Sequence, residues 1–306
     1  MSGNETPSRL STTAGEGARP QVENKSHRNE NFPVASFLLA GDIRPAVLAF
    51  YEFARAADNI ADSPDLPEAE KLEILNEFEK ALLSEQHRPR ISQASALREV
   101  ILARNLSFRH PLDLLMAFRL DASKHRYESW DDLLAYCSKS ANPVGRFVLD
   151  LHGESESTWP ASDALCTVLQ VINHVQDCKS DFLLLNRVYI PLDILSAYGA
   201  DVTALGNAHS SPQLRAAILN VLHLTQDKLA FAATLPTEVR NRRLSLETAV
   251  IAALAFDLVK LIRKSDPLSE DVRHRRRRFA LIGAREIIRM EWARLFSTRK
   301  TAQMGA

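Results

Sequence analysis

Two pairs of aspartates stand four residues apart in stretches that are otherwise rich in apolar residues. Asp58 and Asp62 belong to YEFARAADNIAD, and Asp177 and Asp181 belong to HVQDCKSDFLLLNRVYIP. In a helix, side chains at positions i and i+4 lie above one another on the same face. Each stretch therefore predicts two neighbouring carboxylates on a helix whose other faces are suited to the protein interior.

Carboxylate pairs of this kind suit a divalent cation. Like charges four residues apart destabilise a helix by about 0.2–0.5 kcal/mol, and a buried carboxylate without a partner costs several kcal/mol. Mg²⁺ removes both costs, because it binds one or two carboxylates together with water and substrate phosphate. On facing helices, Asp58, Asp62, Asp177 and Asp181 would hold Mg²⁺ ions that bridge to a diphosphate and help it leave. These four residues are the predicted magnesium ligands.

Further polar side chains continue along the same two helix faces. Tyr51 and Arg55 precede the first pair, and Gln170 and Asn173 precede the second at helical spacing. Taken alone, one Asp-x-x-x-Asp pair is usually a solvated surface pair, Arg55 could form an ordinary salt bridge with the first pair, and the nearby tyrosines could be core aromatics. Two pairs with aligned polar neighbours are a more specific signal than either one.

Composition limits the classes of partner. Lysine plus arginine and aspartate plus glutamate number 38 each in 306 residues, so a general nucleic-acid surface is not expected. The basic run from His274 to Arg278 is either a solvated helix face or a contact for phosphate or an anionic membrane. Three unpaired cysteines and the lack of a signal-peptide pattern favour a cytoplasmic protein, peripheral at most to the inner face of the membrane.

Helical periodicity dominates the chain after a polar beginning, and glycine is scarce. We expect a disordered tail over 1–28, one all-α domain over 29–298 and a short tail over 299–306. The helices are expected over 42–62, 67–84, 92–105, 110–124, 129–151, 161–184, 211–233, 244–264 and 271–297. Pro143 should kink the helix over 129–151, because it removes a backbone hydrogen bond.

The two aspartate-rich stretches resemble the two aspartate-rich motifs of the squalene/phytoene synthase family, the head-to-head prenyl synthases. Within that family, NENFPVAS, YCSKSANPVGR and SDALCTVLQVINHVQD are similar to the bacterial hydroxysqualene synthase branch of hopanoid biosynthesis. The resemblance covers nearly the whole folded region. It implies an all-α isoprenoid-synthase fold around a central cavity. It also implies conversion of presqualene diphosphate and water to hydroxysqualene and diphosphate, without nicotinamide.

The resemblance also implies roles for individual residues. The diphosphate and cation site would be lined by Tyr51, Arg55, Asn173, Arg187 and Tyr189, while Gln170 and Tyr136 would lie near the reacting carbons. Substrate would also contact Asn29 and Asn31, which stand where most of the family has serines, and Asn142. A squalene-sized chain needs a deep apolar pocket, for which Phe53, Phe147, Leu169 and Ile172 are candidate wall residues.

The chain departs from the family pattern at three places. Asn59 stands where an aspartate is common, Glu52 replaces a small residue, and Leu-Leu-Leu-Asn-Arg replaces a Gly-Arg turn before Tyr189. Two other functions stay open: condensation of two prenyl diphosphates, as in a presqualene diphosphate or phytoene-type synthase, and a non-catalytic assembly or binding role. The expected partners are presqualene diphosphate or farnesyl diphosphate, a second synthase and transient contact with a membrane surface.

Overall fold

The computed structural model describes residues 39–84 and 91–304, with side chains up to residue 294. Over these ranges the chain is all-α, with a single isolated bridge between Arg126 and Val188. The helices are α1 (Arg44–Ala61), α2 (Glu68–Leu83), α3 (Ser92–Ala103), α4 (Arg109–Ser123), α5 (Trp130–Ser140), α6 (Asn142–Leu151), α7 (Trp159–Gln176), α8 (Cys178–Leu185), α9 (Leu192–Ala197), α10 (Pro212–Leu224), α11 (Gln226–Ala232), α12 (Leu235–Glu238), α13 (Arg242–Ile262) and α14 (Arg276–Met304). The prediction of an all-α fold is confirmed.

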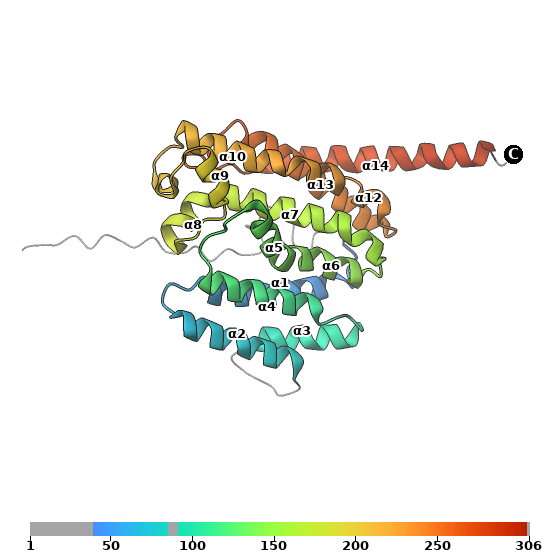
Figure 1. Cartoon of the computed structure of the whole chain (residues 1–306). Helices are drawn as coiled ribbons and strands as arrows, with labels where there is room; N and C mark the ends of the chain where they lie inside the picture. Colours follow the sequence, from blue (N-terminus) through green and yellow to red (C-terminus); the bar gives the residue numbers. More distant parts are fainter. Residues whose placement is uncertain (1–38, 85–90, 305–306) are drawn as a thin grey trace, which may run out of the picture.

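The helices form layers that follow the order of the chain (Figure 1). Helices α1 to α4 pack together at one end, α5 to α7 lie in the middle, and α10, α13 and α14 lie at the other end. Helix α14 packs along α13 and then continues past the bundle towards the C-terminus. In the described part of the chain, no helix is both long enough and apolar enough to cross a membrane.

The core consists of two large hydrophobic clusters. The first joins α1 to α4 with α6, the beginning of α7 and parts of α11 to α13. The second joins α5 and the end of α7 with α8 to α11 and α13. Leu169 on α7 is half-buried and packs against both clusters. Helix α7 therefore connects the two halves of the core, and the predicted polar stripe of Gln170 and Asn173 lies beside the point where they meet.

Three predicted helices are each divided in two. The helix over 129–151 breaks at Ala141, immediately before Asn142 and Pro143, so the proline begins a new helix where a kink was predicted. The helix over 211–233 breaks at Thr225, whose hydroxyl donates to the Leu222 carbonyl at 2.7 Å. The helix over 161–184 breaks at Asp177, inside the second aspartate pair.

Candidate functional site

Although the helix breaks at Asp177, the two aspartates of the second pair remain one helical turn apart. The Asp177 N–H donates to the Asn173 carbonyl at 2.9 Å, and the Asp181 N–H donates to the Asp177 carbonyl at 2.8 Å. These bonds are the i to i+4 bonds of a continuous helix, so the chain bends without losing the four-residue relation on this face. Asn173, Asp177 and Asp181 are all half-buried.

A left-handed residue ends α8 and turns the chain towards the centre of the molecule. Asn186 has φ 51°, and the Arg187 N–H closes the turn by donating to the Asp181 carbonyl at 3.0 Å. Asparagine tolerates this conformation better than other non-glycine residues, which explains how the chain manages without the glycine of the family turn. Arg126 donates to the Asn186 side chain at 2.8 Å and holds the turn in place.

The turn places Arg187 inside the protein, where it contacts the first aspartate-rich stretch. Its guanidinium donates to the Asp62 carboxylate at 2.5 Å, to the Ala61 carbonyl at 3.1 Å and to the Asp121 carbonyl at 2.7 Å. The Arg187 side chain is 6% exposed. The two predicted motifs are therefore joined directly, through an arginine of the second motif and an aspartate of the first.

Asp121 on α4 lies at the centre of this network, although no sequence pattern singled it out. Its carboxylate accepts hydrogen bonds from the Tyr136 hydroxyl at 2.8 Å and the Tyr189 hydroxyl at 3.0 Å. Burial raises the pKa of Asp121 to about 6, and the charge of Arg187 opposes this rise. Burial and the nearby Asp121 also raise the pKa of both tyrosines, so their hydroxyls stay protonated and can donate.

Aromatic rings surround these hydroxyls. Tyr127 stacks on Tyr189 with ring centroids 5.4 Å apart, and Tyr136 lies 5.6 Å from Tyr189. His174 stacks closely on the other side of Tyr189, at 3.5 Å and an interplanar angle of 12°. Burial, with the charge of Arg187, lowers the pKa of His174 to about 3, so its imidazole is neutral. Its Nε2 lies 3.0 Å from the Gln170 amide nitrogen. His174 was not among the predicted site residues.

The first aspartate pair lies on a half-buried face of α1. Tyr51, Arg55, Asp58 and Asp62 are all half-buried, and the Arg55 guanidinium donates to Asp58 at 2.6 Å. Burial and the negative charge of Asp62 raise the pKa of Asp58. The two carboxylates therefore repel each other. Asn59 and Glu52, which depart from the family pattern, are exposed and point away from this face.

The predicted wall residues are packed more tightly than a cavity wall requires. Phe53 and Phe147 have no exposed surface, and Phe147 stacks on Phe50 with centroids 4.1 Å apart. Ile172 is also fully buried, whereas Leu169 is half-buried. A hydrocarbon would reach the two phenylalanines only after neighbouring side chains move, so their contact with substrate stays a prediction.

The other three predicted substrate contacts have different outcomes. Asn142 is buried at the start of α6 and accepts a hydrogen bond from the Thr167 hydroxyl at 3.1 Å, which fixes α6 against α7. Asn29 and Asn31 lie outside the described residues.

The oxygen donors at this site fit a hard cation that is shared with a substrate. The candidate ligands, Asp58, Asp62, Asp177 and Asp181, are all carboxylates, which Mg²⁺ prefers. No three acidic, histidine or cysteine side chains of the described residues are grouped closely enough to hold an ion on their own. Mg²⁺ commonly completes its shell with water and substrate phosphate, so one carboxylate pair plus a diphosphate is a sufficient set. Coordination by these four residues stays a prediction.

Comparison with known proteins gives the family. The sequence model of the family described as squalene/phytoene synthase matches residues 26–279. The chain belongs to the squalene/phytoene synthase family. The match includes both aspartate-rich stretches and every described residue of the network around Asp121.

Members of the family with a curated name are similar over most of their length. A hydroxysqualene synthase from Zymomonas mobilis is 47% identical over 256 residues, which are 83% of this chain and 85% of that protein. A hydroxysqualene synthase from Rhodopseudomonas palustris is 48% identical over 81% of this chain and 84% of that protein. A phytoene synthase from Mycobacterium tuberculosis is 30% identical over 55% of each chain.

Solved structures of the family have the same fold. Squalene synthase HpnC from Alicyclobacillus acidocaldarius superposes with a TM-score of 0.67 at 30% identity, over 76% of this chain and 87% of that one. A dehydrosqualene synthase superposes with a TM-score of 0.73 at 19% identity, over 85% of this chain and 92% of that one. The expected isoprenoid-synthase fold is confirmed.

Proposed function

We propose that the protein is a hydroxysqualene synthase, which converts presqualene diphosphate and water to hydroxysqualene and diphosphate. The observation that carries the proposal is the similarity of 46–48% identity to three hydroxysqualene synthases, over more than four fifths of this chain and of each relative. The buried network that links both aspartate-rich stretches supports it, since the reaction needs positive charge around a leaving diphosphate.

In this proposal the carboxylates of Asp58, Asp62, Asp177 and Asp181 hold Mg²⁺ together with the substrate diphosphate. The cation supplies Lewis-acid neutralisation of the departing diphosphate. Arg55 and Arg187 contribute further positive charge at the same place, and Arg187 is fixed by three hydrogen bonds before substrate arrives. A charge that needs no rearrangement during reaction is the most effective kind of electrostatic stabilisation.

The aromatic residues serve the carbocation that remains after diphosphate leaves. The faces of Tyr127, Tyr136 and Tyr189 are rich in electron density and attract a cation. Asp121 holds the hydroxyls of Tyr136 and Tyr189 by hydrogen bonds, so these rings keep their orientation. A neutral His174 beside them adds no positive charge that would repel the carbocation. Water then forms the new C–O bond and loses a proton.

The same proposal includes the partners of the protein. Presqualene diphosphate must come from a synthase that joins two farnesyl diphosphates, so we propose a second synthase as supplier. Substrate and product are long hydrocarbons, so transient contact with the inner face of the membrane from a cytoplasmic location is part of the proposal.

The decisive experiment is incubation of the purified protein with presqualene diphosphate and Mg²⁺, without nicotinamide, followed by product identification. We expect hydroxysqualene and diphosphate. A parallel incubation with farnesyl diphosphate alone tests the condensing activity, which would give presqualene diphosphate. The absence of product from both substrates, with a folded protein, would support a non-catalytic assembly role in place of the proposed function.

A further inference from the structure

The exposed face of α14 carries large apolar side chains. Leu281 is 70% exposed, Ile288 is 58% exposed and Trp292 is 59% exposed. The spacing of seven and four residues places all three on one side of the helix. The opposite side is buried, because Met290 packs with Leu246 and Ala249 of α13. We call the three exposed residues the apolar stripe of α14.

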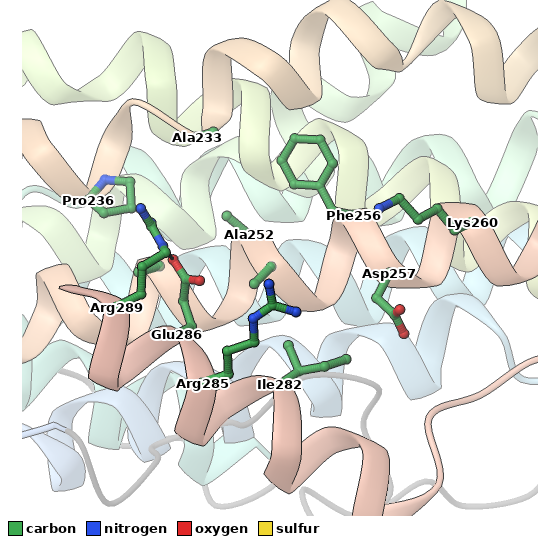
Figure 2. A pocket seen from close by; sticks show the side chains of 12 residues that line it. Ala233, Pro236, Ala252, Phe256, Asp257, Lys260, Ile282, Arg285, Glu286 and Arg289 are labelled. Atoms are coloured by element: carbon green, nitrogen blue, oxygen red, sulfur yellow. Dashed lines mark hydrogen bonds and ion pairs between the residues drawn. The ribbon is translucent and has the colours of Figure 1, made fainter. Parts of the chain in front are cut away.

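A pocket of about 360 Å³ lies next to this stripe, between α13 and α14 (Figure 2). Its apolar lining comes mainly from Ala249, Ala252, Ala253 and Phe256 of α13. Lys260 of α13 and Arg285 of α14 reach the same pocket. Arg285 stands four residues after Leu281 and three before Ile288, so it links the pocket with the apolar stripe. The volume is in the range of small-molecule sites.

The pocket has two positive charges that are not neutralised. Its two acids already have partners, since Asp257 accepts from Arg278 at 2.6 Å and Glu286 accepts from Arg289 at 2.8 Å. Lys260 and Arg285 form no ion pair or hydrogen bond with any described residue. An amphiphilic anion would fit this pocket, with its negative charge beside the two cations and its apolar part against the alanines.

The same end of the molecule carries a strong local excess of positive charge. Residues 273–294 contain eight arginines and two glutamates, an excess of six positive charges, while the formal charge of the whole chain is zero. Arg275, Arg276 and Arg277 are exposed at the start of this segment. The positive charge is therefore concentrated on the surface that also exposes the apolar stripe.

We propose that the apolar stripe of α14 and the α13–α14 pocket dock the protein on an anionic phospholipid bilayer, with lipid phosphate between Lys260 and Arg285. A helix that combines exposed Trp, Leu and Ile with flanking arginines is suited to the boundary between headgroups and acyl chains. Each basic residue near an anionic leaflet adds attraction, and the effect reaches about one Debye length. This inference rests on the membrane contact in the proposed function and assigns it to a surface. Its failure is distinguishable from failure of the proposed reaction, because docking is measured without turnover.

Two other occupants of this surface fit the charges less well. A second copy of the chain would bring two strongly basic segments together, and they would repel each other. Residues 1–38, which precede the described part, contain four basic and four acidic residues if histidine is neutral, so they offer no excess of negative charge. An anionic bilayer is the occupant that complements both the arginines and the apolar stripe.

The test is co-sedimentation of the full-length protein with vesicles of phosphatidylcholine alone, or of phosphatidylcholine with phosphatidylglycerol. We expect binding to the anionic vesicles only, and release at about 1 M salt, where the Debye length is about 3 Å. Lys260→Gln with Arg285→Gln should weaken the partition coefficient roughly thirtyfold, which is about fivefold for each charge removed. Leu281→Ser with Ile288→Ser should also weaken binding, while turnover on detergent-dispersed substrate is unchanged in both variants.

A groove beside α2 provides a matched control. It is lined by Lys80 and the exposed Leu83, but Lys80 is paired with Glu77 at 2.9 Å. Lys80→Gln with Leu83→Ser should bind anionic vesicles like the wild type. Equal binding by the Lys260/Arg285 variant, or no binding by the wild type, would overturn the proposal. So would sedimentation equilibrium that shows a dimer for the wild type and a monomer for Leu281→Ser with Ile288→Ser, because the stripe would then join two copies.

Discussion

The buried polar centre and the surface of α14 use the same residue types for opposite purposes. In the centre, Arg187 is 6% exposed and donates to three oxygen acceptors. On α14, Arg285 lines a pocket and has no partner among the described residues. An arginine whose partners are all within the protein is part of a fixed arrangement. An arginine without a partner is available to a ligand from outside.

The aspartates of the two regions differ in the same way. Burial raises the pKa of Asp121, because Arg187 only partly compensates for the loss of water. Hydrogen bonds from Arg278 and His274 lower the pKa of Asp257, whose side chain is partly exposed beside α14. In the centre, the negative charge of Asp121 is therefore only partly compensated, and a bound cation would stabilise it. The acids beside α14 are already neutralised by arginines.

The largest expected loss of stability is from Arg187→Met, which removes the central cation and leaves its hydrogen-bond partners buried. Breaking a buried pair in this way typically costs about 3–5 kcal/mol of unfolding free energy. Urea denaturation of the wild type and the variant in the same Mg²⁺-free buffer measures this loss of unfolding free energy. Arg277→Met, on the exposed start of α14, should change stability by less than about 0.5 kcal/mol. Similar losses for both variants would contradict the distinction between the two regions.

Asp177→Asn should affect activity and leave the fold intact. Removal of one contribution to transition-state charge stabilisation typically costs roughly 2.7–4 kcal/mol, or a factor of 10²–10³ in rate. The carboxylate forms a partly exposed ion pair with Arg273 at 3.6 Å, and such pairs contribute little to stability. The amide also keeps the shape of the side chain and relieves repulsion by Asp181, so we expect little change in melting temperature. Diphosphate release and melting are measured on one sample. Wild-type turnover in this variant would show that Asp177 is not a metal ligand.

The pH dependence of stability separates Asp121 from Asp257. The pKa of Asp121 is about 6 when folded and 3.8 in the reference state, so the folded state binds the extra proton between these values. The contribution of Asp121 should therefore make stability fall as pH rises from about 4 to 6, by up to roughly 3 kcal/mol. Asp121→Asn should remove this contribution and leave the fall of the same sign that comes from the raised pKa of Asp58. The lowered pKa of Asp257 has the opposite sign: its contribution is present above pH 4 and is lost in acid. Unfolding free energies of Asp121→Asn and Asp257→Asn across pH 3–7 test both signs.

The smallest effects are expected at two glycines that pack against a neighbouring helix. A Cβ at Gly145 would lie 2.4 Å from Ser162 Oγ and 2.6 Å from Cys166 Sγ, where α6 crosses α7. Gly145→Ala should cost about 1–3 kcal/mol through overpacking. A Cβ at Gly283 of α14 would meet Val250 at an ordinary 3.6 Å, so Gly283→Ala should stabilise by about 0.5–1 kcal/mol. Melting temperatures that shift in the same direction would contradict the difference in packing.

The fold was predictable where a local pattern decides it. Apolar periodicity located the longer helices, whereas the short α9 and α12 were not predicted. Ser129 caps α5 by accepting from the Asp132 N–H. The breaks at Thr225 and Asp177 were not predicted. No periodicity signal marks either position.

Without the family resemblance, which pointed to Arg187, Tyr136 and Tyr189, the site was predictable only where residues recur at helical spacing. The two aspartate pairs stood out because each has a partner one turn away. Asp121 did not, because the other acid of α4, Asp113, stands eight residues away and not one turn away. The hydrogen-bond partners of Asp121 come from α5 and from the segment after α8. His174 likewise resembles any histidine on an apolar helix until its stacking on Tyr189 is known. The ion pair between Arg278 and Asp257 could not be predicted either, because the two residues lie 21 positions apart in the sequence.

Arg187 has a consequence for the order in which the protein assembles. Its partners Asp62, Ala61 and Asp121 lie 125, 126 and 66 residues away along the chain, so each contact closes a long loop. Such contacts form late and only once the intervening helices are in place. No fragment that lacks either α1 or the turn at Asn186 can complete the polar centre. Backbone amides around Arg187 should therefore exchange with solvent deuterium only through global unfolding, whereas those near the end of α14 exchange by local fraying.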